Sequence, residues 1–144
     1  MTMQVPLLPR ALRWTAVAVL AGFVFYASIL GAPPETAVDA WKPTLIPLDK
    51  WRHFLAYAAI GYALAYAVTG WELPATRLAV LVVGFVVVYG IGIEVGQSLV
   101  PRRYFSLGDA YANALGGLLV APFYLARRHL TFVPVGELVA SLRE

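Results

Sequence analysis

The chain has 144 residues, of which 60% are apolar and only 13% are charged, and its mean hydropathy is +0.73. This composition excludes an ordinary water-soluble domain. The formal net charge of +3 gives no indication of a nucleic-acid partner, and the lack of cysteine excludes a disulfide framework, a thiol nucleophile and a cysteine-bound metal. We therefore expect a small integral membrane protein whose first partner is the lipid bilayer.

Four apolar segments predict transmembrane helices, at about residues 14–30, 53–69, 78–97 and 109–125. Each has close to the ~20 residues that cross a ~30 Å hydrocarbon core as a helix. Trp14, Trp51 and Trp71 fall at the predicted ends, where amphipathic rings prefer the headgroup region. We expect a single membrane domain over residues 1–144, an all-α, up-and-down bundle of four helices followed by a C-terminal tail over residues 126–144.

The first apolar segment follows Arg10 and Arg13, which is also the pattern of a secretory signal. The apolar run is long for a signal core, so we favour an uncleaved anchor. Lys and Arg are nearly balanced between the two sets of loops, with a small excess on the side that holds both termini. We expect a multi-pass protein of the cell membrane with both termini in the cytoplasm.

The third segment contains a carboxylate. Glu94 is the only charged residue within residues 81–100, and a charge at that depth costs about 2 to 4 kcal/mol even on permissive insertion scales. It therefore needs a proton or a basic partner, for which Lys50 and Arg103 are the candidates. Gln97 lies on the same face, one helical turn further along.

Three predicted helices repeat one layout, with polar side chains near one end and a glycine deeper on the same face. The three stripes are His53, Tyr57 and Gly61; Gly90, Glu94 and Gln97; and Asp109, Asn113 and Gly117. Glycine allows helices to approach closely, so the stripes are expected to face one another. Their polar ends then converge at the outer side of the membrane in one pocket formed by the second, third and fourth helices, which contains Lys50, His53, Glu94, Gln97, Arg103, Asp109 and Asn113.

The predicted pocket should attract an anion. Two helix N-termini point toward it, and Lys50, Arg52 and Arg103 add positive charge. Ser106, followed three residues later by Asp109, predicts the N-terminal cap of the last helix.

Three blocks of sequence in this order resemble the VanZ-like family. They are DKWRHFLAYAAIGYALA over residues 49–65, IEVGQ over residues 93–97 and RYFSLGDAYANALGG over residues 103–117. The family consists of small envelope membrane proteins and is named for an accessory determinant of resistance to the glycopeptide antibiotic teicoplanin. By motif position, the resemblance implies functional roles for Lys50, His53, Tyr57, Glu94, Gln97, Arg103, Asp109 and Asn113. The chain departs from the family at residues 120–124, VAPFY, where a proline is expected to bend the last helix.

We predict that the pocket recognises the anionic or amide-bearing headgroup of a lipid or of a lipid-linked cell-envelope precursor. The expected ligand-binding residues are Lys50, Tyr57, Gln97, Arg103, Asp109 and Asn113. One alternative is a membrane enzyme acting on a lipid phosphate, ester or peptide bond, with Glu94 or His53 as general base and Arg103 stabilising negative charge. The lack of a G-x-S-x-G motif argues against it. A second alternative is an assembly module in which the polar residues only specify helix packing.

No cofactor is implied, and we expect no metal. His129 is predicted to lie on the opposite side of the membrane, which leaves at most His53, Glu94 and Asp109 as ligands. Residues 130–144 show apolar positions at helical spacing and are expected to form a short interfacial helix.

Overall fold

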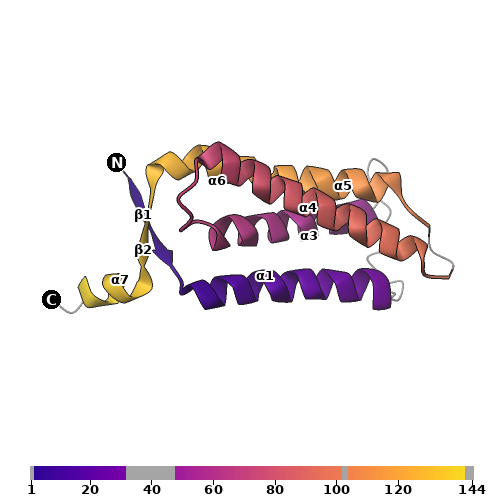
Figure 1. The fold of residues 1–144 in the computed structure, drawn as a ribbon, viewed down its shortest axis with the longest axis horizontal. Coiled ribbons are helices and arrows are strands. Elements are labelled where there is room, and N and C mark those ends of the chain that lie inside the picture. The colour runs from indigo at the N-terminus through magenta and orange to yellow at the C-terminus, as the bar shows by residue number, and fades with distance from the viewer. Residues whose placement is uncertain (1, 32–47, 102–103, 142–144) are drawn as a thin grey trace.

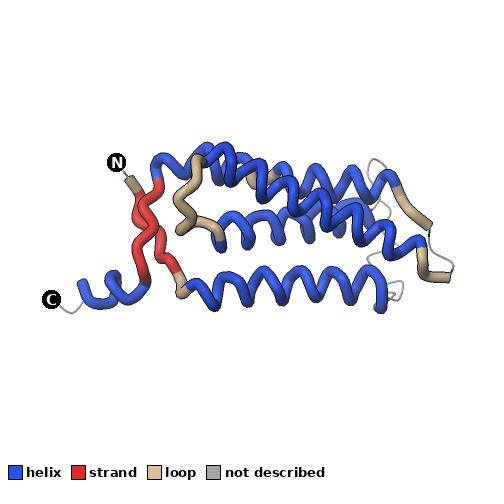
Figure 2. Tube along the Cα trace, viewed as in Figure 1, coloured by secondary structure: helices blue, strands red, loops and turns tan. Residues whose placement is uncertain are grey.

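Long helices lie side by side along the molecule and alternate in direction (Figure 1). The computed structural model describes residues 2–31, 48–101 and 104–141. The helices are α1 (Arg10–Phe25), which continues as the π-helical turn η1 (Tyr26–Leu30), then α3 (Leu48–Ala67), α4 (Ala75–Ser98), α5 (Leu107–Leu118) and α6 (Ala121–Ala126). The described chain is mostly helical, as the all-α prediction requires (Figure 2).

Helix boundaries follow local sequence signals. α1 and α4 begin directly after Pro9 and Pro74, because proline is tolerated at a helix start but not in its interior. Ser106 Oγ accepts a hydrogen bond from the backbone N–H of Asp109 at 3.2 Å, which confirms the predicted cap of α5. The last predicted helix is interrupted near its proline, since α5 ends at Leu118 and α6, with Pro122 in its first turn, begins at Ala121.

α3 is the central helix and packs against α1, α4 and α5. Its contact with α5 is closest at Gly116, where an added Cβ would collide with the Phe54 backbone oxygen. At Gly90, on α4, a Cβ would lie 3.0 Å from atoms of both Asn113 and Tyr57. Close approach at glycine was predicted from the stripes, but Gly116 was not among the glycines singled out.

Within the described ranges, two helical segments have the length and apolar composition to cross a membrane: Arg10–Leu30 and Ala75–Ser98. Large apolar side chains of α4, including Val80 and Val88, are exposed on its outer face. An exposed apolar face of this kind is compatible with a membrane protein. α3 opens with charged residues and α5 has only 12 residues, so four membrane crossings remain a prediction.

The two ends of the described chain form a two-stranded parallel sheet, drawn in red in Figure 2. β1 (Met3–Leu7) pairs with β2 (Leu130–Pro134), and the helix α7 covers only Val135–Ser141. The helix predicted over residues 130–144 was therefore wrong for its first five residues. The β-branched and aromatic side chains of β2 favour a strand, and its pairing partner lies at the other end of the chain, where periodicity within β2 cannot reveal it.

Candidate functional site

The start of α3, the end of α4 and the start of α5 meet at the end of the molecule opposite the sheet (Figure 1). Most of the predicted site residues come together there in what we call the polar cluster: Lys50, His53, Glu94, Asp109 and Asn113. The cluster thus joins three helices.

Lys50 pairs with two aspartates. Its Nζ lies 2.6 Å from Asp109 Oδ1 and 2.7 Å from Asp49 Oδ2. The sequence had made Lys50 a candidate partner of Glu94, but the structure pairs Lys50 with these two aspartates instead. Partial burial alone would lower the pKa of Lys50, but its hydrogen bonds and charge pairing with both aspartates raise that pKa above its ordinary value. For Asp49 the directions are reversed. Burial alone would raise the pKa of this carboxyl, but the hydrogen bond and charge of Lys50 hold its pKa below the ordinary value.

Glu94 is completely buried and links α4 to the start of α5. Its Oε2 accepts a hydrogen bond from the Ser106 backbone N–H at 3.2 Å, and its Oε1 lies 3.5 Å from Asn113 Nδ2. In a capping box the carboxylate at Asp109 would accept that N–H. Here a carboxylate from another helix replaces it, which leaves Asp109 available to Lys50.

His53 lies between the carboxylates of the cluster. Its Nδ1 is 3.0 Å from Asn113 Oδ1 and 3.9 Å from Glu94 Oε1, and its Nε2 is 3.7 Å from Asp109 Oδ1. An amide oxygen only accepts hydrogen bonds, so the contact with Asn113 requires the proton to be on Nδ1. Nε2 therefore faces Asp109.

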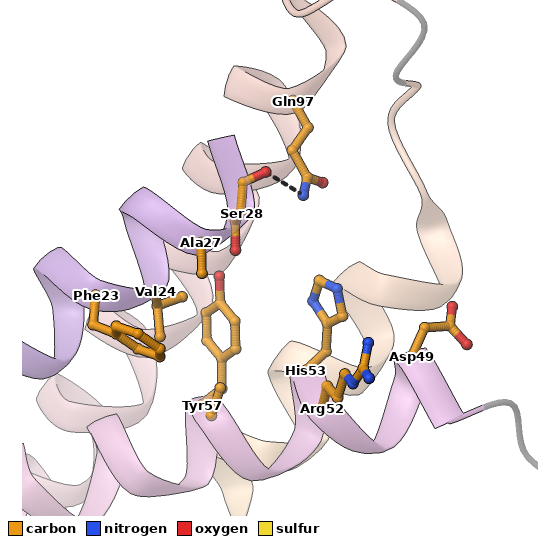
Figure 3. A pocket seen from close by; sticks show the side chains of 10 residues that line it. Phe23, Val24, Ala27, Ser28, Asp49, Arg52, His53, Tyr57 and Gln97 are labelled. Carbon is orange, nitrogen blue, oxygen red and sulfur yellow. Dashed lines mark hydrogen bonds between the residues drawn. The ribbon is translucent and has the colours of Figure 1, made fainter. Parts of the chain in front are cut away.

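A cavity of about 490 Å³ lies beside the polar cluster, between the end of α1 and the start of α3 (Figure 3). We call it the α1–α3 cavity; its lining consists of Phe23, Val24, Ala27, Ser28, Asp49, Arg52, His53, Ala56, Tyr57 and Gln97. His53 belongs to both the cavity and the cluster. The ring of Tyr57 lies nearly parallel to that of His53, at an interplanar angle of 7°.

Two lining side chains differ in how their polar atoms are used. Gln97 Nε2 donates to the backbone oxygen of Ser28 at 3.1 Å, so the Gln97 amide is bound to η1 (Figure 3). The Tyr57 hydroxyl is buried and has no hydrogen-bond partner in the part of the chain that the structure describes. Tyr57 also lines the α1–α3 cavity, so a donor without a partner among the described residues belongs to the cavity wall.

The predicted single pocket is thus resolved into a polar cluster and an adjoining cavity. The wall supplied by α1 was missed, because the first apolar segment shows no stripe of polar residues. Its weak signal was Ser28, a polar residue near the end of an apolar run. Arg103, which was expected in the pocket, lies outside the described residues.

Residues 12–130 match the sequence profile of the VanZ/LLP1 family. The chain belongs to the VanZ/LLP1 family. The matched range includes every residue of the polar cluster and of the α1–α3 cavity, and it confirms the resemblance carried by the three sequence blocks. Comparisons with curated proteins and with solved structures give no match. Membership of the VanZ/LLP1 family does not by itself identify a substrate.

Proposed function

We propose that this VanZ/LLP1 protein is a multi-pass protein of the cell membrane that recognises the headgroup of an anionic or amide-bearing lipid or of a lipid-linked cell-envelope precursor. The observation that carries the proposal is the lining of the α1–α3 cavity, which is apolar on one wall and polar on the other. Amphiphilic ligands require this division, because their chains and headgroups prefer different surroundings.

The apolar wall comes from Phe23 and Val24 of α1, along which an acyl chain can lie. The polar wall comes from α3, where the Arg52 guanidinium supplies charge for a phosphate or carboxylate. The Tyr57 hydroxyl supplies a further donor to a headgroup oxygen. In this proposal Asn113 positions the His53 ring through its contact with Nδ1, and Lys50 holds the carboxylate of Asp109 beside that ring. None of the three contacts the headgroup directly.

The placement of the termini supports the proposed topology. β1 and β2 pair with each other, which brings both ends of the described chain to one end of the helices. The polar cluster lies at the opposite end (Figure 1). Termini on one side and a site on the other fit an even number of crossings, and the small excess of Lys and Arg on the terminal side favours the cytoplasm.

The test is native mass spectrometry of the full chain released from membranes, which identifies the lipids that remain bound. We expect wild type to retain a specific anionic or lipid-linked species that Arg52→Ala and Arg103→Ala lose. Arg77→Ala is the matched control, because Arg77 is exposed in the first turn of α4, at the far end of the molecule. If all four proteins carry the same mixture of lipids, headgroup recognition is wrong and the polar residues serve helix packing.

The position of His53 favours a second candidate, an enzyme acting on a lipid phosphate or a lipid-linked precursor. Its imidazole is oriented by Asn113 and also borders the cavity, as a general base must. Incubating the purified protein with the retained lipid would show a new product mass if catalysis occurs. Retention of full biological activity in both Glu94→Gln and His53→Ala would rule this candidate out.

The proposal extends to a relation with teicoplanin resistance, because the VanZ-like family is named for a determinant of that resistance. The proposed headgroup recognition would place the protein where envelope precursors are handled. Teicoplanin susceptibility of cells with and without the protein tests this relation, with Arg52→Ala as the variant expected to behave like the deletion.

A further inference from the structure

The polar cluster contains a set of metal-ligating groups, and headgroup recognition as proposed above does not require an ion at them. One potential ligand atom from each of His53, Glu94 and Asp109 lies within 4.8 Å of the other two. The three residues come from α3, α4 and α5, so helix packing alone brings them together. We propose that these three side chains bind a divalent metal ion.

The separations are close to those expected around one ion. His53 Nε2 lies 3.7 Å from Asp109 Oδ1, and the ligand atoms that His53, Glu94 and Asp109 offer, one from each residue, all lie within 4.8 Å of one another. With metal–ligand bonds of about 2.0–2.2 Å, two ligands of the same ion lie roughly 3 to 4 Å apart. Small side-chain rotations are therefore enough to close the site.

The imidazole is already oriented for ligation. Because Nδ1–H donates a hydrogen bond to Asn113 Oδ1, a neutral His53 has its lone pair on Nε2, the nitrogen that lies nearer Asp109. At 3.7 Å this contact is too long for a hydrogen bond, and a cation between the Nε2 lone pair and the carboxylate would interact favourably with both. Metal-bound histidines commonly donate their second N–H to a neighbouring acceptor, which is the role Asn113 has here.

The charges of the cluster also call for a cation. Glu94 is fully buried, and its nearest basic group in the described chain is His53, at 3.9 Å. The ammonium of Lys50 is already shared between Asp49 and Asp109. A dication between Glu94 and Asp109 would compensate the buried carboxylate, which an apolar surrounding otherwise makes costly.

Lys50 gives the proposal a distinctive consequence. Its Nζ occupies Asp109 Oδ1 and would compete with the metal for that carboxylate. It also contacts Asp49 at 2.7 Å, so it can release Asp109 and stay paired. Removing the ammonium should therefore strengthen metal binding, which a purely structural cluster does not predict.

The donor set indicates which ions to test. One imidazole and two carboxylates suit ions such as Zn²⁺ or Mn²⁺, whereas Ca²⁺ prefers oxygen ligands only. His53 and Asp109 are 19% and 14% exposed, and His53 borders the α1–α3 cavity, so an ion has an entry route.

The experiment uses the full chain in detergent, stripped with a chelator, and measures binding of Zn²⁺ and Mn²⁺ alone by isothermal titration calorimetry. We expect one saturable site in wild type, binding weakened by roughly tenfold or more in Asp109→Asn and Glu94→Gln, and tighter binding in Lys50→Met. His129→Ala removes the other histidine of the chain, which is exposed near the sheet, and should bind as wild type does.

Absence of saturable binding in wild type, or weaker binding in Lys50→Met, would overturn the proposal. The gain expected in Lys50→Met cannot result from misfolding, so the test remains valid if the carboxylate variants fold poorly. No lipid enters the measurement. Failure of the metal site is therefore distinguishable from failure of headgroup recognition.

Discussion

The two ends of α3 both hold charged side chains in buried or half-buried positions, but their partners differ in kind. At the end near the sheet, Arg13 is only 8% exposed and its Nη1 donates to the backbone oxygens of Tyr66 at 3.0 Å and Ala67 at 2.9 Å. Arg127 donates in the same way to the oxygen of Thr69 at 2.9 Å. At the other end, the polar cluster pairs side chains with side chains.

This difference separates structural from functional burial of charge. Carbonyls at a helix C-terminus lack hydrogen-bond partners and carry partial negative charge, so an arginine there satisfies fixed groups that never change protonation. The carboxylates, imidazole and ammonium of the polar cluster can each exchange a proton or a partner. The arginine end should therefore set stability, and the polar cluster should set binding.

Gly116→Ala should have the largest effect, because it disturbs the backbone contact between α5 and α3. An added Cβ would collide with the Phe54 backbone oxygen and force α5 away from α3. Overpacking against backbone should cost about 3 kcal/mol. Gly92→Ala is the control, since nothing lies within 4 Å of its Cβ, and the change should be neutral or stabilise by up to about 1 kcal/mol. Thermal unfolding of the two variants in detergent compares them; equal melting temperatures would contradict the close α3–α5 contact.

Arg13→Ala should have the next largest effect, confined to stability. It leaves two carbonyls at the end of α3 without their charged donor, which we expect to cost about 2 to 3 kcal/mol. Arg10→Ala, one turn earlier and exposed, should cost less than about 0.5 kcal/mol. Lipid and metal binding by folded Arg13→Ala should equal those of wild type. If folded Arg13→Ala selectively lost lipid or metal binding, the arginine end of α3 would contribute to binding as well as to stability, which contradicts the proposed difference between the two ends.

The polar cluster was largely predictable from the sequence, whereas the cavity beside it was not. His53, Glu94, Asp109 and Asn113 lie at helical spacing in apolar segments, where polar side chains must face one another or water. Alternating helix direction then brings their ends together. The cap at Ser106 was also predictable, because the signal for it, Ser106 followed three residues later by Asp109, is local in the sequence.

What could not be predicted depends on contacts between distant segments. Lys50 pairs with Asp109, and Glu94 accepts a hydrogen bond from Ser106, instead of the two pairing with each other. These partners depend on side-chain distances between helices, which spacing along one helix does not give. The strand at β2 depends on β1 at the other end of the chain. The cavity wall on α1 depends on how α1 packs against α3. An apolar helix without a polar stripe gives no sign of which face it turns inward.

A pair of tyrosine variants sharpens the comparison at a smaller scale. The Tyr66 hydroxyl donates to Pro6 O at 2.7 Å and accepts from Leu8 N at 2.9 Å, so Tyr66→Phe should cost about 1 to 1.5 kcal/mol of stability. The Tyr57 hydroxyl has no partner among the described residues, so Tyr57→Phe should leave stability unchanged within about 0.5 kcal/mol. It should instead reduce lipid retention severalfold in native mass spectrometry. The reverse pattern would show that the Tyr57 hydroxyl serves the fold.

The smallest expected effect is the pH dependence of the ion pairs at Lys50. The pKa of Lys50 is raised above 10.5, so its contribution to stability is complete below pH 10.5 and is lost as pH rises through the folded-state value. The pKa of Asp49 is lowered below 3.8, so its contribution is complete above pH 3.8 and is lost as pH falls through the folded-state value. The difference in stability between wild type and Lys50→Met should therefore be constant from about pH 4 to about pH 10, on the order of 1 kcal/mol or less, and shrink on either side.

Arg13→Ala provides the matching measurement at the other end of α3. Backbone carbonyls do not titrate and arginine keeps its charge throughout this range, so the stability difference between wild type and Arg13→Ala should stay flat from pH 3 to pH 11. Melting temperatures of the three proteins across that range give both difference curves. A flat curve for Lys50→Met would mean that its ion pairs add nothing to stability, and a sloping curve for Arg13→Ala would mean that a titrating group, rather than the carbonyls, holds the arginine. Only a curve that bends for Lys50→Met and stays level for Arg13→Ala agrees with exchangeable partners at one end of α3 and fixed partners at the other.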